Sequence, residues 1–221
     1  MTQNIIPPKK VVFYIDGFNF YNGFKSRTDV NEIWKDYYWL DFVKLCSQFV
    51  FPHDNQVLHK VKYFTAPPLN AQKKSRQSAL FGANKLLNGD MFEVFNGHYA
   101  DKFITCNATC KEQFKVPEEK CTDVNLALAM VNDCIDGMVD VITLVTADSD
   151  QVSTIKYIKS KLPHVKIKVH FPPDRSSNEI RSIINPVVFL ENHEDKFKNS
   201  KMPGVVEGQG KKYTRPESWK K

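Results

Sequence analysis

Two short runs of the chain are entirely apolar, and they constrain the fold more than any other feature. Val11–Ile15 reads VVFYI and Val141–Val145 reads VITLV. A strand with no polar face is typical of the middle of a parallel sheet, where helices cover both sides. Four further segments are predicted as strands: Val61–Thr65, Met91–Phe95, Val165–Phe171 and Pro186–Leu190.

Segments with helical periodicity separate these runs. Ala79, Leu80 and Ala83 lie on one helix face, and Ala127, Met130 and Cys134 lie on another. Strands that alternate with helices predict an α/β fold, a Rossmann-like and mostly parallel sheet flanked by helices. Val165–Phe171 alternates apolar residues with lysine and histidine, which places that strand near an edge of the sheet.

The positive charge is concentrated at one end. The chain has 221 residues, with 31 Lys and Arg against 25 Asp and Glu. Residues 196–221 hold eight of these basic residues and two of the acidic ones, so residues 1–195 are formally neutral. We therefore predict one domain over 1–195 and a basic, flexible tail over 196–221, which either contacts a polyanion or only aids solubility. No apolar run is long enough for a membrane span or a secretion signal, so a cytoplasmic protein without a membrane partner is expected.

Four aspartates follow from this topology as candidate site residues. Asp16 directly follows the first apolar run, Asp148 and Asp150 follow the run at 141–145, and Asp123 opens the helix between. Ligands of open parallel sheets bind beyond the carboxyl ends of the strands, where all four side chains are expected. Clustered carboxylates repel one another unless a proton or a cation intervenes, and oxygen ligands suit Mg²⁺ or Mn²⁺. Helix capping is the alternative explanation for Asp123 and for one acid of the 148/150 pair.

Three motifs resemble the signatures of NYN domains, which belong to the PIN-like nucleases. They are Ile15–Tyr21 (IDGFNFY), Glu119–Ala127 (EKCTDVNLA) and Thr143–Asp150 (TLVTADSD), in the order of that family. The resemblance implies a metal-dependent endoribonuclease with Asp16, Asp123, Asp148 and Asp150 as catalytic metal ligands. It also matches Asn19 and Thr146 to polar positions that orient water or phosphate. RNA is the partner that this resemblance implies.

Basic residues are expected on the same rim of the sheet. Lys73, Lys74 and Arg76 follow the second predicted strand, and Arg175 follows the fifth. Such residues position a phosphate backbone without reading its sequence, although a solvated helix start explains each of them as well.

A polar insert over residues 98–120 interrupts the alternation of strands and helices. His98, Cys106, Cys110 and Cys121 bracket it, and four such ligands suit one structural Zn²⁺. The alternative is a set of free thiols in a loop.

Two other function classes compete with the ribonuclease. The first is a non-catalytic RNA-binding or scaffold module that retains an acidic pocket. The second is a small-molecule phosphohydrolase, although Phe18 stands where a common phosphatase motif has a second aspartate. Dinucleotide binding is disfavoured, because the turn after the first strand lacks GxGxxG.

Overall fold

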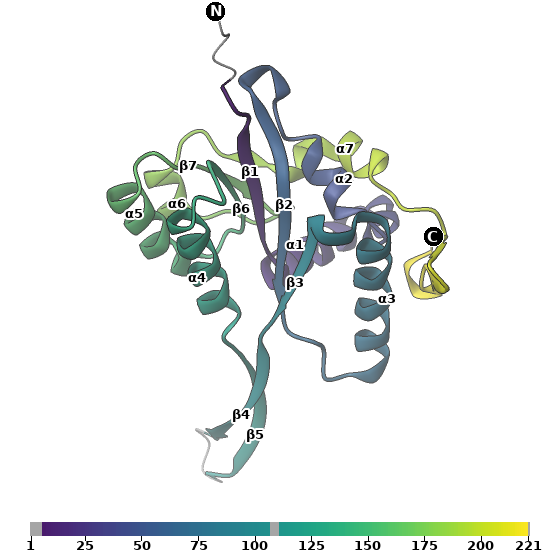
Figure 1. The fold of residues 1–221 in the computed structure, drawn as a ribbon. Helices are drawn as coiled ribbons and strands as arrows, with labels where there is room; N and C mark the ends of the chain where they lie inside the picture. The colour runs from purple at the N-terminus through teal and green to yellow at the C-terminus, as the bar shows by residue number, and fades with distance from the viewer. Residues whose placement is uncertain (1–5, 107–110, 221) are drawn as a thin grey trace, which may run out of the picture.

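A computed structural model describes residues 6–106 and 111–220, and its centre is a six-stranded, fully parallel sheet (Figure 1). The strand order is β3-β2-β1-β6-β7-β8. The strands are β1 (Lys9–Asp16), β2 (Gln56–Thr65), β3 (Phe92–Asn96), β6 (Val141–Val145), β7 (Lys166–Phe171) and β8 (Val188–Phe189). The predicted α/β class is confirmed.

The two fully apolar runs are neighbours at the centre of the sheet, as their composition predicts. β1 pairs with β6 from Val11↔Val141 to Ile15↔Val145. Val11, Phe13 and Ile15 join the core on one face, and Val12 and Tyr14 join the core on the other. The order of strands reverses between β1 and β6, so their carboxyl ends form the switch point at which α/β sheets bind ligands.

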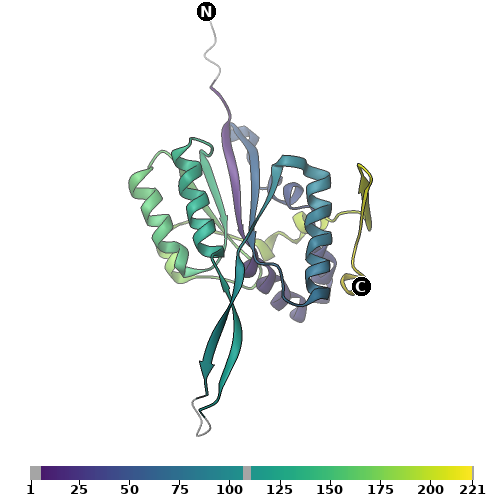
Figure 2. The same ribbon diagram turned by 60° about the horizontal axis from the view of Figure 1, so that its bottom comes forward.

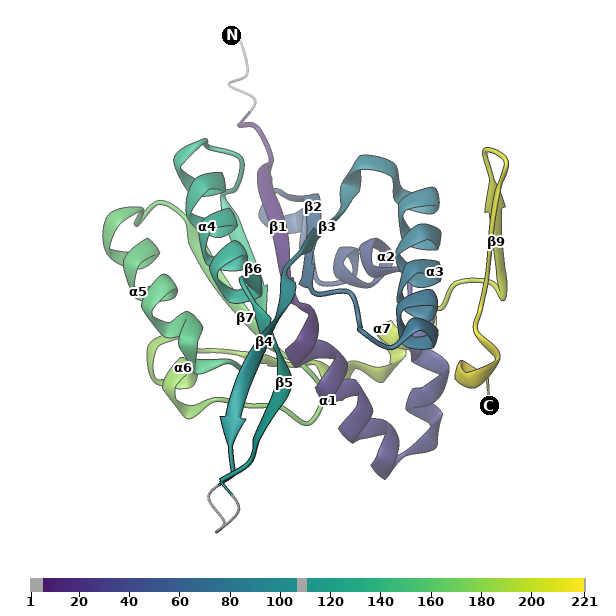
Figure 3. The same cartoon turned by 90° about the horizontal axis from the view of Figure 1, so that it is seen from below.

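Helices cover both faces of the sheet (Figures 1 and 3). Phe20, Phe42 and Phe197 fill the core on the face of α1, α2 and α7. Leu126, Ile155 and Ile180 fill the core on the face of α4, α5 and α6. The helices are α1 (Gly17–Val30), α2 (Phe42–Ser47), α3 (Ala71–Asn88), α4 (Thr122–Ile135), α5 (Val152–Lys161), α6 (Asn178–Ile183) and α7 (Glu194–Asn199), and the longest 3-10 helix is η1 (Glu32–Tyr38).

The predicted insert is a two-stranded antiparallel arm rather than a loop. β4 (His98–Thr105) pairs with β5 (Gln113–Lys120), and the arm extends away from the body of the sheet (Figure 2). Its side chains are mostly exposed, including Phe103 and Phe114. The base of the arm lies next to the carboxyl ends of the sheet strands, because Gly97 donates a backbone hydrogen bond to Thr65.

The C-terminal segment differs from the predicted flexible tail. β9 (Val205–Gly208) and β10 (Lys211–Thr214) form a hairpin that contacts α3. Val206 is buried in a small cluster with Trp39 and Ala83, and the ring of Tyr213 lies against Gly82. These apolar contacts hold the hairpin on the body of the protein, whereas its lysines remain exposed. In the described part of the chain, no helix combines the length and the apolar character of a membrane span.

Candidate functional site

Asp16 is the most constrained residue at the switch point. It ends β1 and caps α1, where its Oδ1 accepts a hydrogen bond from the backbone N–H of Asn19 at 3.0 Å. Its Oδ2 accepts one from the hydroxyl of Thr146 at 2.7 Å. The side chain is buried, and burial raises the pKa of this carboxyl although both hydrogen bonds lower it. Residue 17, which follows Asp16, has to be glycine, because a Cβ at this position would lie 2.5 Å from the carbonyl oxygen of Phe64.

Asp148 and Asp123 approach Asp16 from two other elements. Carboxylate oxygens of these three residues lie within 4.8 Å of one another. Asp148 follows β6, and its backbone N–H donates to the hydroxyl of Thr146 at 3.0 Å. Asp123 lies in the first turn of α4 and is half-buried. Burial, followed by the charges of Asp16 and Asp148, raises the pKa of Asp123 to about 6.

The structure places two further predicted residues: Asp150, which was expected to bind metal, and Asn19, which was expected to orient water or phosphate. Asp150 is exposed and lies outside the three-carboxylate cluster, although its charge contributes to the raised pKa of Asp123. Its backbone N–H donates to Oδ1 of Asp148 at 3.0 Å. Asn19 accepts a hydrogen bond from the backbone N–H of Ala147 at 3.2 Å through its side-chain oxygen. Asn19 therefore holds the loop after β6 against the start of α1 and positions the acids.

The three acids open onto a cavity of about 230 Å³. The other lining residues are Phe18, Asn19, Asn22, Glu119 and Arg175. Arg175 is thus at the acids, as predicted from its place after β7. Sequence reasoning did not assign Glu119, whose carboxylate accepts a hydrogen bond from the backbone N–H of Thr122 at 3.1 Å. The sequence feature that could have identified Glu119 is the Glu-x-x-Thr spacing before α4.

The donor set fits a hard divalent cation. Three carboxylates supply oxygen ligands only, which suits Mg²⁺ or Mn²⁺. The cavity leaves space for further ligands beside the acids. A cation would also relieve the mutual repulsion of the acids that raises the pKa of Asp123.

An aromatic pocket of about 240 Å³ adjoins the acidic cavity. Phe18 and Asn22 line both. Further lining side chains of the aromatic pocket are Tyr21, Tyr38, Tyr63, Phe81, Tyr99 and Trp219. The ring of Trp219 stacks on Tyr38, with the centroids 5.7 Å apart. Sequence reasoning missed this pocket because its rings come from segments that are distant in the chain.

The predicted phosphate-binding residues of α3 line the aromatic pocket instead. Lys73 and Arg76 belong to its rim, and Arg76 donates a hydrogen bond to the hydroxyl of Ser218 at 3.1 Å. Lys74 is exposed and lines neither cavity. The cationic groups therefore lie beside a ring-binding surface.

The predicted zinc site is not assembled by the arm. His98 begins β4 and Cys106 follows its last residue, so the length of an eight-residue strand separates them. At roughly 3.4 Å per residue this is about 25 Å, too far for one ion. Cys121 lies at the base of the arm, after β5, and Cys110 lies outside the described residues.

Comparison with known proteins changes the functional prediction. No family model matches the chain, so the NYN resemblance stays a prediction. The chain is 29% identical to the 6-hydroxy-3-succinoylpyridine 3-monooxygenase HspA of Pseudomonas putida, over 96% of this chain and 76% of that protein. A crystal structure of a protein of unknown function from Vibrio parahaemolyticus has a similar fold, with a TM-score of 0.53 at 15% identity over 85% of this chain and 95% of that one.

The prediction of a metal-dependent ribonuclease is therefore wrong. The relative is named as a monooxygenase, an oxidoreductase, and not as a hydrolase of phosphodiester bonds. Neither alternative, the RNA-binding module or the phosphohydrolase, agrees with that name. The position of the acids was predicted, but the substrate and the reaction do not follow from it. A carboxylate cluster at a switch point constrains which cation can bind and not which reaction is catalysed.

Proposed function

We propose that the chain is a monooxygenase-like oxidoreductase that hydroxylates a small aromatic acid. The observation that carries this proposal is that two cavities adjoin. Phe18 and Asn22 line both the acidic cavity and the aromatic pocket, so a ring held in the aromatic pocket would lie beside the acids. The relative supports the class of reaction, since its name gives a monooxygenase that acts on a substituted pyridine.

The aromatic pocket fits the flat part of such a substrate. Tyr38, Trp219 and Phe81 offer ring faces and edges, and aromatic pairs favour stacked or edge-to-face contact. Lys73 and Arg76 on the rim suit an anionic substituent, and Arg forms two parallel hydrogen bonds with a carboxylate. A pocket of about 240 Å³ holds one small ring with a short side chain.

The acidic cavity supplies the reacting end. Asp16, Asp123 and Asp148 would hold a divalent cation, for which we propose Mn²⁺ over Mg²⁺ because Mn²⁺ also changes its oxidation state. When bound, such a cation supplies a site for dioxygen. Without a cation, burial and the neighbouring acids raise the pKa of Asp123 to about 6, and a bound cation would hold this carboxylate ionised. Arg175 adds a positive charge to the same cavity.

The stoichiometry of a monooxygenase reaction determines which co-reactants the protein needs. One atom of dioxygen enters the ring as a hydroxyl group, and the other leaves as water. Two electrons and two protons are consumed, and we propose a reduced nicotinamide or a reduced flavin as the external electron donor. Dioxygen uptake, donor oxidation and product formation should therefore be equal in amount.

The test uses 6-hydroxy-3-succinoylpyridine as the probe. Protein loaded with Mn²⁺, Fe²⁺ or Mg²⁺ is incubated with NADH or reduced flavin in air, and the product is analysed by mass spectrometry with ¹⁸O₂. We expect incorporation of one labelled oxygen and its loss in Asp148→Asn. The matched control is Asp150→Asn, which removes a neighbouring acid outside the cluster and should retain activity. Absence of labelled product with every cation and donor, together with absence of probe binding by tyrosine and tryptophan fluorescence, would overturn the proposal.

A further inference from the structure

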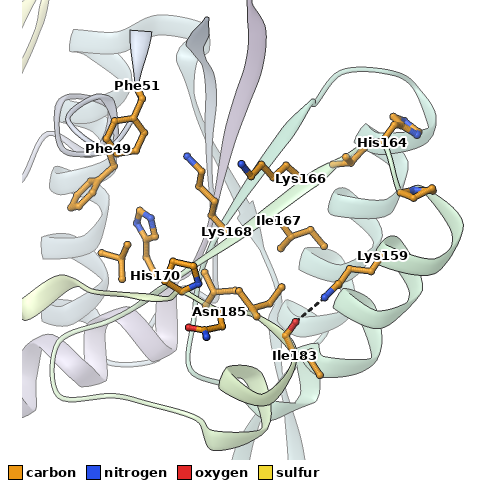
Figure 4. Close-up of a pocket in the computed structure, with 16 residues that line it drawn as sticks. Phe49, Phe51, Lys159, His164, Lys166, Ile167, Lys168, His170, Ile183 and Asn185 are labelled. Atoms are coloured by element: carbon orange, nitrogen blue, oxygen red, sulfur yellow. Dashed lines mark hydrogen bonds between the residues drawn. The ribbon is translucent and has the colours of Figure 1, made fainter. Parts of the chain in front are cut away.

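A third cavity lies along the open edge of β7, away from the acidic site. It has a volume of about 640 Å³ and shares no lining residue with either the acidic cavity or the aromatic pocket. It exists because β8 pairs with β7 only at His170↔Val188 and Phe171↔Phe189. The preceding half of β7 therefore has no strand on this side among the described residues. Phe49 and Phe51 form one wall, and the segment around Ile183 and Asn185 forms the other (Figure 4).

The charged side chains of this cavity are all basic. Lys159, Lys166 and Lys168 line it together with His164 and His170, and none of the described carboxylates does so. His164 and Lys166 also line a neighbouring cavity, to which Asp54 and Asp140 belong. The Nζ of Lys159 is occupied, since it donates to the carbonyl oxygen of Ile183 at 2.8 Å. The other two lysines extend to the same side of β7 (Figure 4). Residues two apart in a strand are about 7 Å apart, so one ligand can reach both.

Few groups of the protein offset the positive charges of Lys166 and Lys168. The Nζ of the exposed Lys166 makes no hydrogen bond or ion pair with the residues that the structure describes, whereas its backbone N–H donates to the carbonyl oxygen of Asp140 at 2.9 Å. The Nζ of Lys168 lies 4.8 Å from the centroid of the Phe51 ring and 3.4 Å from Oε1 of Gln56. Burial, and after it the charge of Lys166, lowers the pKa of Lys168, and the exposed Asp54 opposes this only in part. An anion between the lysines would remove their repulsion.

His170 provides an independent sign of a ligand. Its side chain is 3% exposed, and its Nδ1 has no hydrogen-bond partner. The ring lies against Phe49, with the centroids 4.9 Å apart, and burial lowers its pKa to about 3. The ring is thus neutral. A buried polar atom without a partner is costly. Nδ1 is itself covered, so a ligand in the cavity that His170 lines would satisfy it only after the ring turns.

We propose that this cavity binds a small organic anion with a flat apolar body. Its anionic group, a carboxylate or a sulfonate, lies between Lys166 and Lys168, and its body lies against Phe49 and Phe51. Lysines on an edge strand also prevent aggregation of sheets. That role explains the charges but neither the cavity nor the unpartnered atom of His170. The proposal is independent of the monooxygenase reaction, because the two sites share no residue.

The test measures binding of 8-anilinonaphthalene-1-sulfonate, a flat apolar sulfonate whose fluorescence increases in apolar sites. We expect one site per chain in the wild type. The double variant Lys166→Gln/Lys168→Gln should bind about tenfold more weakly, the loss typical of a charge-assisted hydrogen bond. Both lysines are at the surface of β7, and an unchanged melting temperature will show that the variant folds. Inorganic phosphate should compete poorly, because it lacks the apolar body.

The control is Lys73→Gln/Arg76→Gln, which removes two charges from the rim of the aromatic pocket. The aromatic pocket of about 240 Å³ holds one small ring, whereas the probe carries a naphthalene and a phenyl ring, so this variant should bind the probe as the wild type does. Equal affinity in the Lys166/Lys168 variant and the wild type would overturn the proposal. Loss of binding only in the Lys73/Arg76 variant would also overturn it and would assign the probe to the substrate pocket.

Discussion

The substitution Asp123→Asn should stabilise the protein in the absence of divalent cations. The carboxyl of Asp123 has its pKa raised to about 6 from its usual 3.8, first by burial and then by its acidic neighbours. Each tenfold change in an acid dissociation constant is worth about 1.4 kcal/mol, so the ionised form costs the folded state at most about 3 kcal/mol at neutral pH. Because Asp123 is only half-buried, solvent screening reduces this to about 1–2 kcal/mol.

A second effect of the substitution has the opposite sign. Asp123 lies in the first turn of α4, where a negative charge stabilises a helix by about 0.3–1 kcal/mol. The net expectation is that Asp123→Asn raises the free energy of unfolding by about 1 kcal/mol at pH 7.5. The gain should shrink as the pH falls, since an acid with a raised folded-state pKa destabilises the fold only where that acid is ionised. About a third of the gain should remain at pH 4.5.

The assay is urea unfolding with EDTA at pH 7.5 and pH 4.5. The matched control is Asp195→Asn, which removes an exposed acid from the first turn of α7 and should lose about 0.3–1 kcal/mol at pH 7.5. A lower free energy of unfolding for Asp123→Asn than for wild type at pH 7.5 would refute the reasoning. Saturating Mn²⁺ should reverse the order, because a cation stabilises the state that binds it.

Three further outcomes follow from the same structure. Mn²⁺ at about 100 times its dissociation constant should stabilise the wild type by about 2.7 kcal/mol in thermal unfolding, and Asp148→Asn by much less; an equal effect would place the cation elsewhere. Gly17→Ala should cost about 1–3 kcal/mol or more in urea unfolding, since its Cβ would lie 2.4 Å from Cε1 of Tyr63, whereas Gly204→Ala meets nothing within 4 Å and should be neutral. Val206→Ala should lower the free energy of unfolding by about 1–2 kcal/mol, because its side chain is buried between the C-terminal hairpin and the body of the protein. Val205 is exposed, so Val205→Ala should change the free energy of unfolding little. Equal effects of the two substitutions would mean that the hairpin is detached in solution.

The centre of the fold could be predicted because its signals are local. Two apolar pentapeptides identify the central strands, and parallel geometry then brings Asp16 and Asp148 to one edge. Asp123 follows from the same rule, because α4 returns antiparallel to β6. Asp150 did not join the cluster: Asp148 caps the short 3-10 helix that follows it, its Oδ1 accepts from the backbone N–H of Asp150, and the side chain of Asp150 is exposed. Such a choice between two acids depends on one turn and not on periodicity.

The C-terminal hairpin carried a signal that charge counting obscured. Gln209 and Gly210 both have positive φ, 50° and 71°, as the two central residues of a tight hairpin turn require. Glycine after a polar residue between VVEG and KKYT is the sequence sign of that turn. The zinc prediction failed for a related reason. Spacing along the sequence suggested proximity, whereas the hairpin register places His98 and Cys106 at opposite ends of β4.

The remaining question is why the fold tolerates three carboxylates in one cavity. Asp16 ends β1 and Asp148 follows β6, the two strands that bury apolar side chains on both faces, and Asp123 approaches them from α4. The hydrogen bonds from Asn19 and Thr146 fix Asp16 although its ionised form is disfavoured there. Helix capping accounts for Asp16 and Asp148 one at a time, but it does not explain why both face a third acid that caps nothing. Such an arrangement costs folding free energy without a ligand. We propose that a ligand reverses this cost, and three carboxylates suit a divalent cation.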